Sequence, residues 1–203
     1  YPSERGVELV QEVMQESGIP YYYTCGNHDW HYEGMEGTSY ELRKKWRELR
    51  LSPLFQGHNP IAYGVEHKGV RLLFLDTSDY EVESAQLEFI RKEARSRKPF
   101  IVFQHIPLYA PSRSVAYGIG HPEWGAATDG GYKTERRNRW PEGHQKTDYD
   151  FYETLVNAPN LIATFAGHVH LFGTDIINGK PHFTVGPNFT GAYYEVQVMP
   201  KKK

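Results

Sequence analysis

The sequence predicts a single α/β domain in which short buried strands alternate with amphipathic helices. The chain has 203 residues, of which 39% are hydrophobic and 24% charged, so one substantial core can form. Runs with helical spacing alternate with short apolar runs rich in β-branched or aromatic residues. Three of these apolar runs lead directly into histidine-bearing turns, as is typical of strand ends that open onto a ligand-binding crevice.

A helix followed by a strand is predicted at the start of the chain. Val7, Val10 and Met14 recur at helical spacing, and Gly18 stands where such a helix would end. Residues 21–24 are rich in aromatics and include a β-branched threonine, which predicts a short strand.

A second helix is predicted after a capping box. Residues 38–41 read Thr-Ser-Tyr-Glu, the pattern in which the first and fourth residues satisfy the free amide groups of a helix start. Leu42, Trp46 and Leu49 then form one apolar face of the predicted helix.

The middle of the chain predicts a hairpin, a helix and a strand in that order. Residues 61–66 and 70–75 flank the turn-forming sequence 67–69, which favours a β-hairpin. A helix is expected over residues 84–97, where Lys-Pro follows, and residues 100–104 predict the next strand.

Residues 109–146 carry no regular periodicity, although they contain many aromatic and arginine side chains. A connection of this length without secondary structure is usually functional or disordered. The glycines favour mobility of this segment, whereas the aromatic side chains argue against full disorder.

The last part of the chain returns to regular structure. Thr147 is expected to cap a helix that runs to about Val156, and residues 161–165 predict a short apolar strand. Asn-Gly at residues 178–179 is a strong signal for a type I′ hairpin, and residues 192–198 predict a last strand.

Histidines stand in three turns that follow predicted strands. The turns are Gly-Asn-His-Asp at 26–29, Gln-His-Ile-Pro at 104–107 and Gly-His-Val-His at 167–170. Imidazoles delivered from three strand ends can converge on one metal site. His168 and His170 would point to the same side of an extended segment and could face two neighbouring ions. An isolated His-x-His is more often a surface feature, and Asn followed by His-Asp is also typical of a plain turn.

The order of these motifs resembles the calcineurin-like metallophosphoesterase superfamily. Its later motifs are Gly-Asn-His-Asp or Glu, a lone histidine, and Gly-His-x-His, and residues 73–77 and 86–90 are similar to a strand and helix of the same family. The purple-acid-phosphatase-like branches resemble this chain most. The resemblance implies a sandwich of two mixed β-sheets flanked by helices.

The resemblance also implies a role for each site residue. The implied metal ligands are Asn27, His105 and His168 for a second ion, and His170 for a first ion. His28 is similar to the family histidine that binds no metal and assists the leaving group, and Asp29 would orient it.

The implied activity is metal-dependent hydrolysis of phosphate mono- or diesters through a dinuclear metal centre and a metal-bound water. The expected cofactors are two divalent or trivalent transition-metal ions, Mn, Fe or Zn. The expected substrate is a phosphoester small molecule or a phosphoprotein. In the family the interval corresponding to residues 109–146 helps to shape the mouth of the site, so we expect a specificity loop or a plain insertion there.

Two early family motifs, Asp-x-His and Gly-Asp, do not occur before Asn27. Residues 1–203 are therefore expected to be the C-terminal two-thirds of a single metallophosphoesterase domain, with the insertion or specificity loop at about 109–146. The N-terminal segment is then a candidate partner that could be supplied in trans, and the chain alone is expected to be inactive. Asp76 or Asp79 are the alternatives for the absent bridging carboxylate.

Two other functions remain open on the sequence. The first is a non-catalytic metal- or ligand-binding descendant of the same fold. The second is a carbohydrate-binding domain, suggested by the aromatic segment and by the Asn-Phe-Thr sequence at 188–190.

Composition excludes several classes of partner. The formal net charge is −2, which gives no electrostatic signal for nucleic-acid binding. No apolar run approaches the roughly 18 to 20 residues of a membrane span.

Cys25 is the single cysteine, so no internal disulfide forms, and it is expected to be a small buried packing residue.

Overall fold

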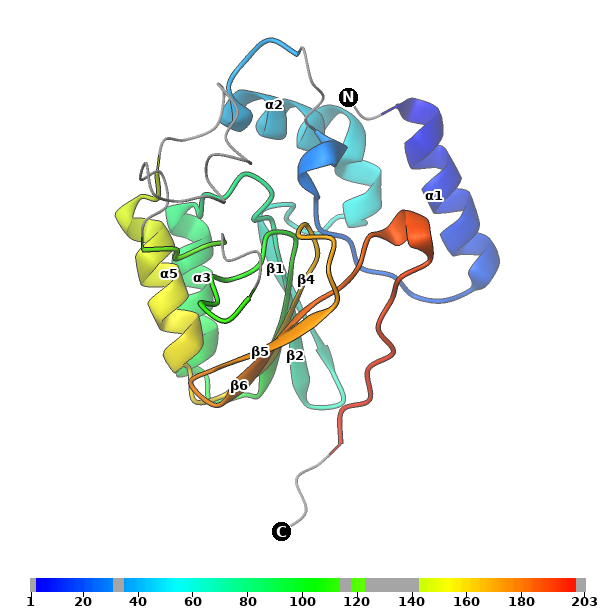
Figure 1. The fold of residues 1–203 in the computed structure, drawn as a ribbon. Coiled ribbons are helices and arrows are strands. Elements are labelled where there is room, and N and C mark those ends of the chain that lie inside the picture. Colours follow the sequence, from blue (N-terminus) through cyan, green and yellow to red (C-terminus); the bar gives the residue numbers. More distant parts are fainter. Residues whose placement is uncertain (1–2, 31–34, 114–117, 123–142, 200–203) are drawn as a thin grey trace.

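A computed structural model describes residues 3–30, 35–113, 118–122 and 143–199. The described residues contain one mixed sheet of six strands in the order β1-β2-β3-β4-β6-β5 (Figure 1). Its strands are β1 (Ala62–His67), β2 (Val70–Leu75), β3 (Phe100–Gln104), β4 (Leu161–Ala166), β5 (Gly173–Ile177) and β6 (Lys180–Thr184). The predicted α/β class is confirmed.

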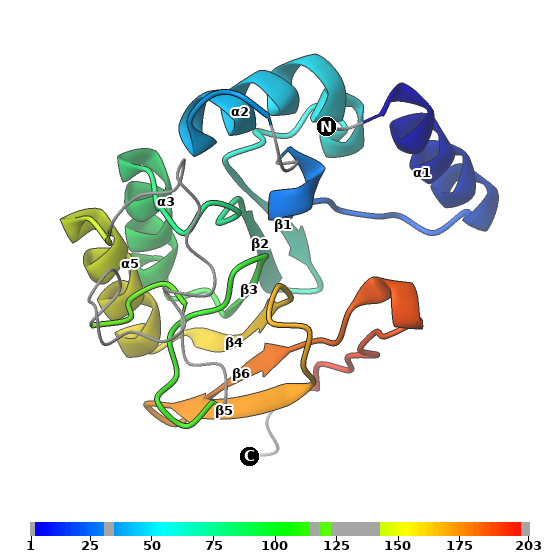
Figure 2. The ribbon, with the colours of Figure 1, turned by 45° about the horizontal axis from the view of Figure 1, so that its top comes forward.

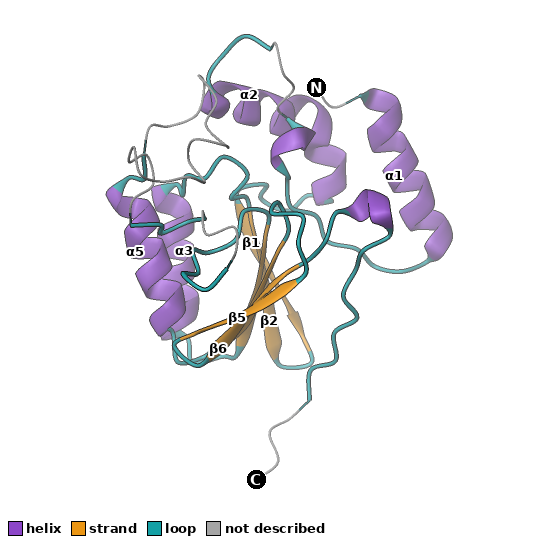
Figure 3. Cartoon of the chain, in the orientation of Figure 1, coloured by secondary structure: helices purple, strands orange, loops and turns teal. Residues whose placement is uncertain are grey.

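The four central strands β2, β3, β4 and β6 run parallel, and the edge strands β1 and β5 are antiparallel to their neighbours. Helices α3 (Ser84–Arg95) and α5 (Lys146–Asn157) lie side by side on one face of the sheet (Figures 1 and 3). The carboxyl ends of the parallel strands consequently point to one end of the molecule, where their following loops gather.

Two hairpins close the edges of the sheet with two-residue turns. Asn178 and Gly179 have φ values of 49° and 75°, which confirms the type I′ turn predicted from Asn-Gly. Lys68 and Gly69, with φ of 47° and 81°, make the other turn. His67 is thus the last residue of β1, paired with Val70, rather than part of the turn.

The helices agree with the sequence with small shifts at their ends. Helix α1 (Glu4–Ser17) ends at Gly18, whose φ is 64°, but only Val7 of its apolar residues is buried and Val10 is 40% exposed. Helix α5 is capped by Gln145 and Asp148 instead of Thr147, because the Asp148 carboxylate accepts from the Gln145 amide. No described helix is long and apolar enough to span a bilayer.

The second predicted helix begins as expected and then changes its geometry. Thr38 and Glu41 form the capping box of α2 (Ser39–Trp46). A π-helical segment, Arg47–Leu51, follows directly and adds residues to the turn. This shift buries Leu51 and leaves Leu49 67% exposed, so the prediction that Leu49 belongs to the apolar face is wrong.

Two predicted strands are extended but not paired in the sheet. The Tyr23 amide donates to the Tyr63 hydroxyl, and the Thr24 hydroxyl donates to the Leu75 carbonyl, so side chains rather than a strand ladder hold residues 21–24. Residues 192–198 likewise form no strand. The expected second sheet is therefore not formed by the described residues, because its two predicted strands lack ladder partners among them.

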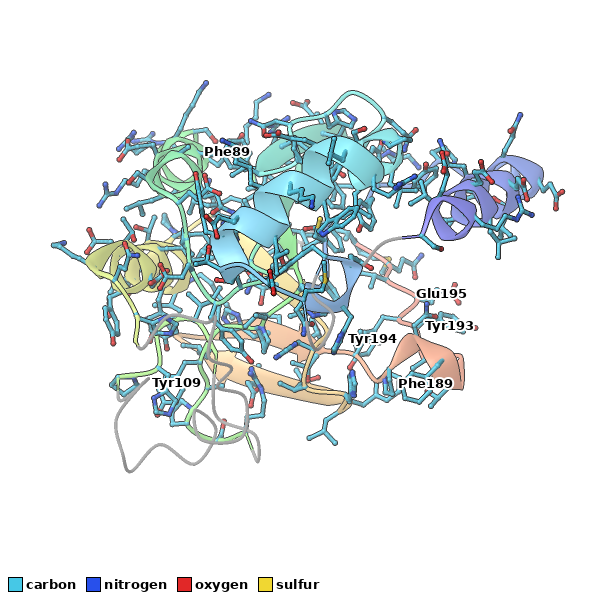
Figure 4. All side chains as sticks on the ribbon, turned by 90° about the horizontal axis from the view of Figure 1, so that it is seen from above. Phe89, Tyr109, Phe189, Tyr193, Tyr194 and Glu195 are labelled. Carbon is cyan, nitrogen blue, oxygen red and sulfur yellow. The ribbon has the colours of Figure 1, made fainter. Side chains whose placement is uncertain are left out.

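A row of aromatic rings crosses the other face of the sheet. Tyr63, Phe74, Phe103, Phe165 and Phe183 stand at paired register positions of five strands, with successive ring centroids 4.9, 5.1, 5.4 and 4.8 Å apart. The C-terminal segment, which includes Phe189, Tyr193 and Tyr194, lies on this side, away from α3 and α5 (Figures 2 and 4). This aromatic face borders the loops that carry the histidines.

Candidate metal centre

The site lies where the central parallel strands end (Figures 1 and 2). His105 follows β3 directly and His168 follows β4 by two residues, so neighbouring strands deliver them to the same end of the sheet. Asn27 begins the short 3-10 turn η1 (Asn27–Asp29), which the Thr24 contact with Leu75 holds beside the end of β2. Three distant segments thus converge, as the sequence predicted.

Asn27, His105 and His168, here called the trio, bring three possible donor atoms together. Oδ1 of Asn27 lies 2.8 Å from Nε2 of His105 and 3.3 Å from Nδ1 of His168, and the two ring nitrogens are 3.2 Å apart. Donors bound to one ion at about 2.1 Å are separated by about 3.0 Å in octahedral and about 3.4 Å in tetrahedral geometry. The trio therefore fits a single transition-metal ion.

The trio contains an amide oxygen and two imidazoles, a donor set that suits zinc, manganese or iron. Among the residues that the structure describes, no three His, Cys, Asp or Glu side chains are placed so that they alone could hold a metal ion. The asparagine oxygen is consequently an essential third donor in this region.

His105 is held in the neutral form that a metal ligand requires. Burial lowers its pKa well below the usual value of 6.5, and the nearby imidazoles of His168, His28 and His170 lower it further. The same interactions show that all four histidines share one neighbourhood. Neutral imidazole leaves a nitrogen lone pair for coordination at physiological pH.

Gly26 permits the close approach of His105 to the η1 turn. A β-carbon at Gly26 would lie 3.1 Å from Cε1 and 3.2 Å from Nδ1 of the His105 ring, tighter than ordinary van der Waals contact. Any larger residue would push the imidazole away from Asn27. The glycine of the Gly-Asn-His-Asp motif is thus needed for packing at the site.

The loop of residues 76–80, which follows β2, makes hydrogen bonds beside both histidines of the trio. Thr77 accepts a hydrogen bond from the Ile106 amide at 3.1 Å and donates to the Ile106 carbonyl at 3.3 Å, which fixes the backbone next to His105. The hydroxyl of Tyr80 lies 2.5 Å from Nε2 of His168. Both histidines of the trio are therefore positioned by one buried loop.

Asp76 and Asp79, the alternatives for the bridging carboxylate, are engaged in buried contacts of this loop. Asp76 accepts hydrogen bonds from Ser78 and, at 2.8 Å, from Arg47. Asp79 pairs with the buried guanidinium of Arg43. Burial raises the pKa of Asp79 to about 6, against the opposing attraction of Arg43. Because their oxygens are engaged in these ion pairs, the alternative bridging role expected from the sequence is not supported.

Asp29 closes the η1 turn. Its Oδ2 accepts the Gly26 amide and the Tyr23 hydroxyl, each at 2.8 Å. Burial raises the pKa of this carboxyl, while the two hydrogen bonds and nearby His28 act in the opposite direction. His28 itself is exposed. The role of Asp29 in orienting His28 stays a prediction, and its observed contacts hold the turn that presents both His28 and Asn27.

His168 and His170 do not occupy an extended segment. Their φ values are 64° and 56°, both left-handed, with the buried Val169 between them. His168 therefore points into the trio, whereas His170 is exposed and its ring meets Phe189 edge-on at 6.0 Å between centroids. The expectation that an extended backbone directs both rings to one side is wrong, because αL residues reverse the chain locally.

Sequence reasoning missed two residues of this site, Tyr80 and Thr77. Each acts through tertiary contact with another loop; Tyr80 lies in no recognisable motif, and Thr77 ends a segment that resembled the family without indicating a role in the site. Their position directly after a strand that neighbours β3 was the available signal.

The chain was compared with known proteins. A family model described as calcineurin-like phosphoesterase matches residues 3–172. The chain belongs to the calcineurin-like phosphoesterase family. No curated protein sequence matches it.

One solved structure shares the fold at low sequence identity, and a second gives a weaker match. A dimetal phosphatase from Danio rerio superposes with a TM-score of 0.56 and 14% identity, over 90% of this chain and 65% of that chain. A putative 5'-nucleotidase from Staphylococcus aureus, solved with alpha-ketoglutarate, gives a TM-score of 0.46 and 12% identity, over 91% of this chain and 35% of that chain. The chain thus spans less than two thirds of either structure.

Proposed function

We propose that the protein is a hydrolase that cleaves phosphate mono- or diesters with the help of two transition-metal ions. The convergence of Asn27, His105 and His168 is the observation that carries this proposal. Family membership and the fold shared with a dimetal phosphatase support it. When bound, Mn, Fe or Zn ions would supply an activated water and neutralise charge on the phosphoryl oxygens.

His28 stands next to the trio without belonging to it. It is exposed at the end of the sheet where the trio lies, and it is close enough to influence the pKa of His105. In this position its imidazolium can donate a proton to a leaving oxygen. Asp29 keeps the η1 turn closed through Gly26 and Tyr23, so His28 is presented on an ordered backbone.

A centre of two metal ions needs more donor atoms than the trio provides. His170 is the proposed ligand of the other ion, and it lies in the same loop as His168. Neither Asp76 nor Asp79 is available to bridge two ions. We propose that further carboxylate and imidazole ligands come from another segment, either from additional chain of the same protein or, in trans, from a partner.

The substrate is proposed to be a phosphoester small molecule or a phosphoprotein. Residues 109–146 are the candidate specificity loop, of which 114–117 and 123–142 lie outside the described residues. The described remainder of this loop is anchored near β5, because Arg113 pairs with Asp175 at 2.8 Å. The N-terminal end of this loop is therefore held close to the sheet.

Hydrolysis of an aryl phosphate in the presence of added manganese or zinc tests the proposal. The 203-residue chain alone should be at or near background, because one ion cannot perform two-metal chemistry. Adding the segment that carries the further carboxylate and imidazole ligands should restore chelator-sensitive turnover. His105→Ala should abolish that turnover. Robust turnover by the chain alone, lost in His105→Ala, would show that a carboxylate within these 203 residues, Asp76 or Asp79 first among the candidates, takes the bridging place. Metal binding without hydrolysis in the completed protein would favour a non-catalytic metal-binding descendant.

A further inference from the structure

We propose that Tyr80 is a positioning residue that fixes the tautomer of His168, so that its Nδ1 lone pair faces the metal position. The inference rests on the proposed function only in taking the trio as a metal site. Tyr80 lies 88 positions from His168 in sequence and belongs to no motif. Its relevance comes entirely from the fold.

The geometry places two different partners on the two nitrogens of His168. Nε2 lies 2.5 Å from the Tyr80 hydroxyl, and Nδ1 faces Oδ1 of Asn27 and Nε2 of His105. If the Tyr80 oxygen accepts the Nε2 hydrogen, Nδ1 carries the lone pair. A metal-ligating histidine commonly donates its other ring N–H to an oxygen, which fixes both the tautomer and the ring orientation.

The ring of Tyr80 also restricts the imidazole sterically. The two rings meet edge to face, with centroids 5.3 Å apart and planes at 83°. Tyr80 is only 1% exposed, so its hydroxyl is shielded from solvent. A buried hydrogen bond of this kind holds the His168 ring more firmly than a contact with water would.

The backbone of Tyr80 is held in a conformation that tyrosine rarely adopts. Its φ is 69°, in the left-handed region that is unusual for a bulky residue. Such conformations persist where the surroundings over-determine them, often at functional sites. Here the surroundings are the ion pair of Asp79 with Arg43 and the hydrogen bond from Trp30 to Ser78 at 2.7 Å.

The loop of residues 76–80 therefore acts as a rigid support. Asp76, Thr77, Ser78, Asp79 and Tyr80 are all buried, each with at most 2% exposure. Thr77 fixes the backbone beside His105, and Tyr80 fixes the side chain of His168. One loop thus holds both imidazoles of the trio at the separation a single ion needs.

Tyr80→Phe removes the hydroxyl and keeps the ring, so it isolates the hydrogen bond. Zinc titration of the 203-residue chain should show affinity about 10-fold to 100-fold weaker in Tyr80→Phe than in the wild type. Tyr149→Phe is the matched control. Among the described residues, the Tyr149 hydroxyl donates only a long hydrogen bond of 3.4 Å, to the His121 carbonyl. Circular dichroism and the unfolding midpoint verify that both variants fold.

Long-range ¹H–¹⁵N NMR of the metal-free chain gives a second readout that needs no metal and no activity. The wild type should hold His168 mainly as the Nε2–H tautomer, and Tyr80→Phe should shift it to a mixture. A dominant Nδ1–H tautomer in the wild type, or equal zinc affinity of wild type and Tyr80→Phe, would overturn the inference. A wild-type chain that binds no zinc would instead contradict the proposed function, while the tautomer still decides the role of Tyr80.

Discussion

Nδ1 of His168 lies 3.2 Å from Nε2 of His105, although 63 residues separate them in the chain. The parallel pairing of β3 with β4 explains this proximity, since both strands end at the same edge of the sheet. Asn27 reaches the same point from a turn that is held against the end of β2. A donor set of this kind depends on the sheet, so its chemistry and the stability of the fold are linked.

His28→Ala tests the proposed role in leaving-group departure. In protein with a complete metal centre, turnover on an ester with a poor leaving group should fall by roughly 10² to 10⁴, with metal content unchanged. Turnover of an ester with an activated leaving group should fall much less, because that group needs no proton to depart. Steady-state kinetics on both esters, with His67→Ala as an exposed-histidine control, measures the difference. Equal losses on the two esters would assign His28 to binding or structure.

Arg43→Met tests whether the buried ion pairs hold the loop of residues 76–80. Arg43 is 1% exposed and pairs with Asp79 and, at 3.0 Å, with Glu83. Removing the guanidinium leaves a buried carboxylate without its partner, which should lower the free energy of unfolding by about 3 to 5 kcal/mol. Urea denaturation measures this loss. Arg5→Met, which removes an exposed pair with Glu12, should lower the free energy of unfolding far less, and similar losses in both variants would refute the argument.

The burial of His182 predicts that the folded protein loses stability in mild acid. Burial, with Arg113 nearby, lowers its pKa to about 4 from a usual value of 6.5. The folded-state pKa is depressed, so the unfolded chain takes up the proton first as the pH falls. Stability is then fully present above a pH of about 6.5 and is lost as the pH falls toward 4, by an amount on the order of 3 kcal/mol.

Urea denaturation at several pH values between 7 and 4 measures this effect. His182→Gln should flatten the dependence of the unfolding free energy on pH over that window. His67→Gln, which removes an exposed histidine, is the matched control. An identical pH profile for wild type and His182→Gln would contradict the depressed pKa.

Local sequence signals predicted those elements whose geometry is set by neighbouring residues. The Asn178-Gly179 turn, the capping box at Thr38 and the end of α1 at Gly18 all appear as expected. Each depends on a backbone conformation or hydrogen bond within a few residues. The convergence of His105 and His168 was likewise predictable, because β3 and β4 end at one edge of the sheet, whereas side-chain contacts of residues 23 and 24 place Asn27 there.

Tertiary contacts decided the features that the sequence could not predict. The π-helical turn at Arg47–Leu51 accompanies the burial of the arginine ion pairs and moves Leu49 to the surface. Residues 21–24 have strand composition but meet side chains instead of a strand ladder. The left-handed backbone of His168 and His170 has no local signal, since neither residue is glycine or asparagine.

Zinc titration of the purified 203-residue chain by calorimetry tests the central claim, that Asn27, His105 and His168 hold one metal ion. The wild type and His67→Ala, in which an exposed histidine outside the site is removed, should each bind about one ion. His168→Ala and His105→Ala should lose most of this binding while their unfolding transitions stay cooperative. Stoichiometry and affinity in His168→Ala equal to those of the wild type would contradict the account and remove the trio from the ligand set.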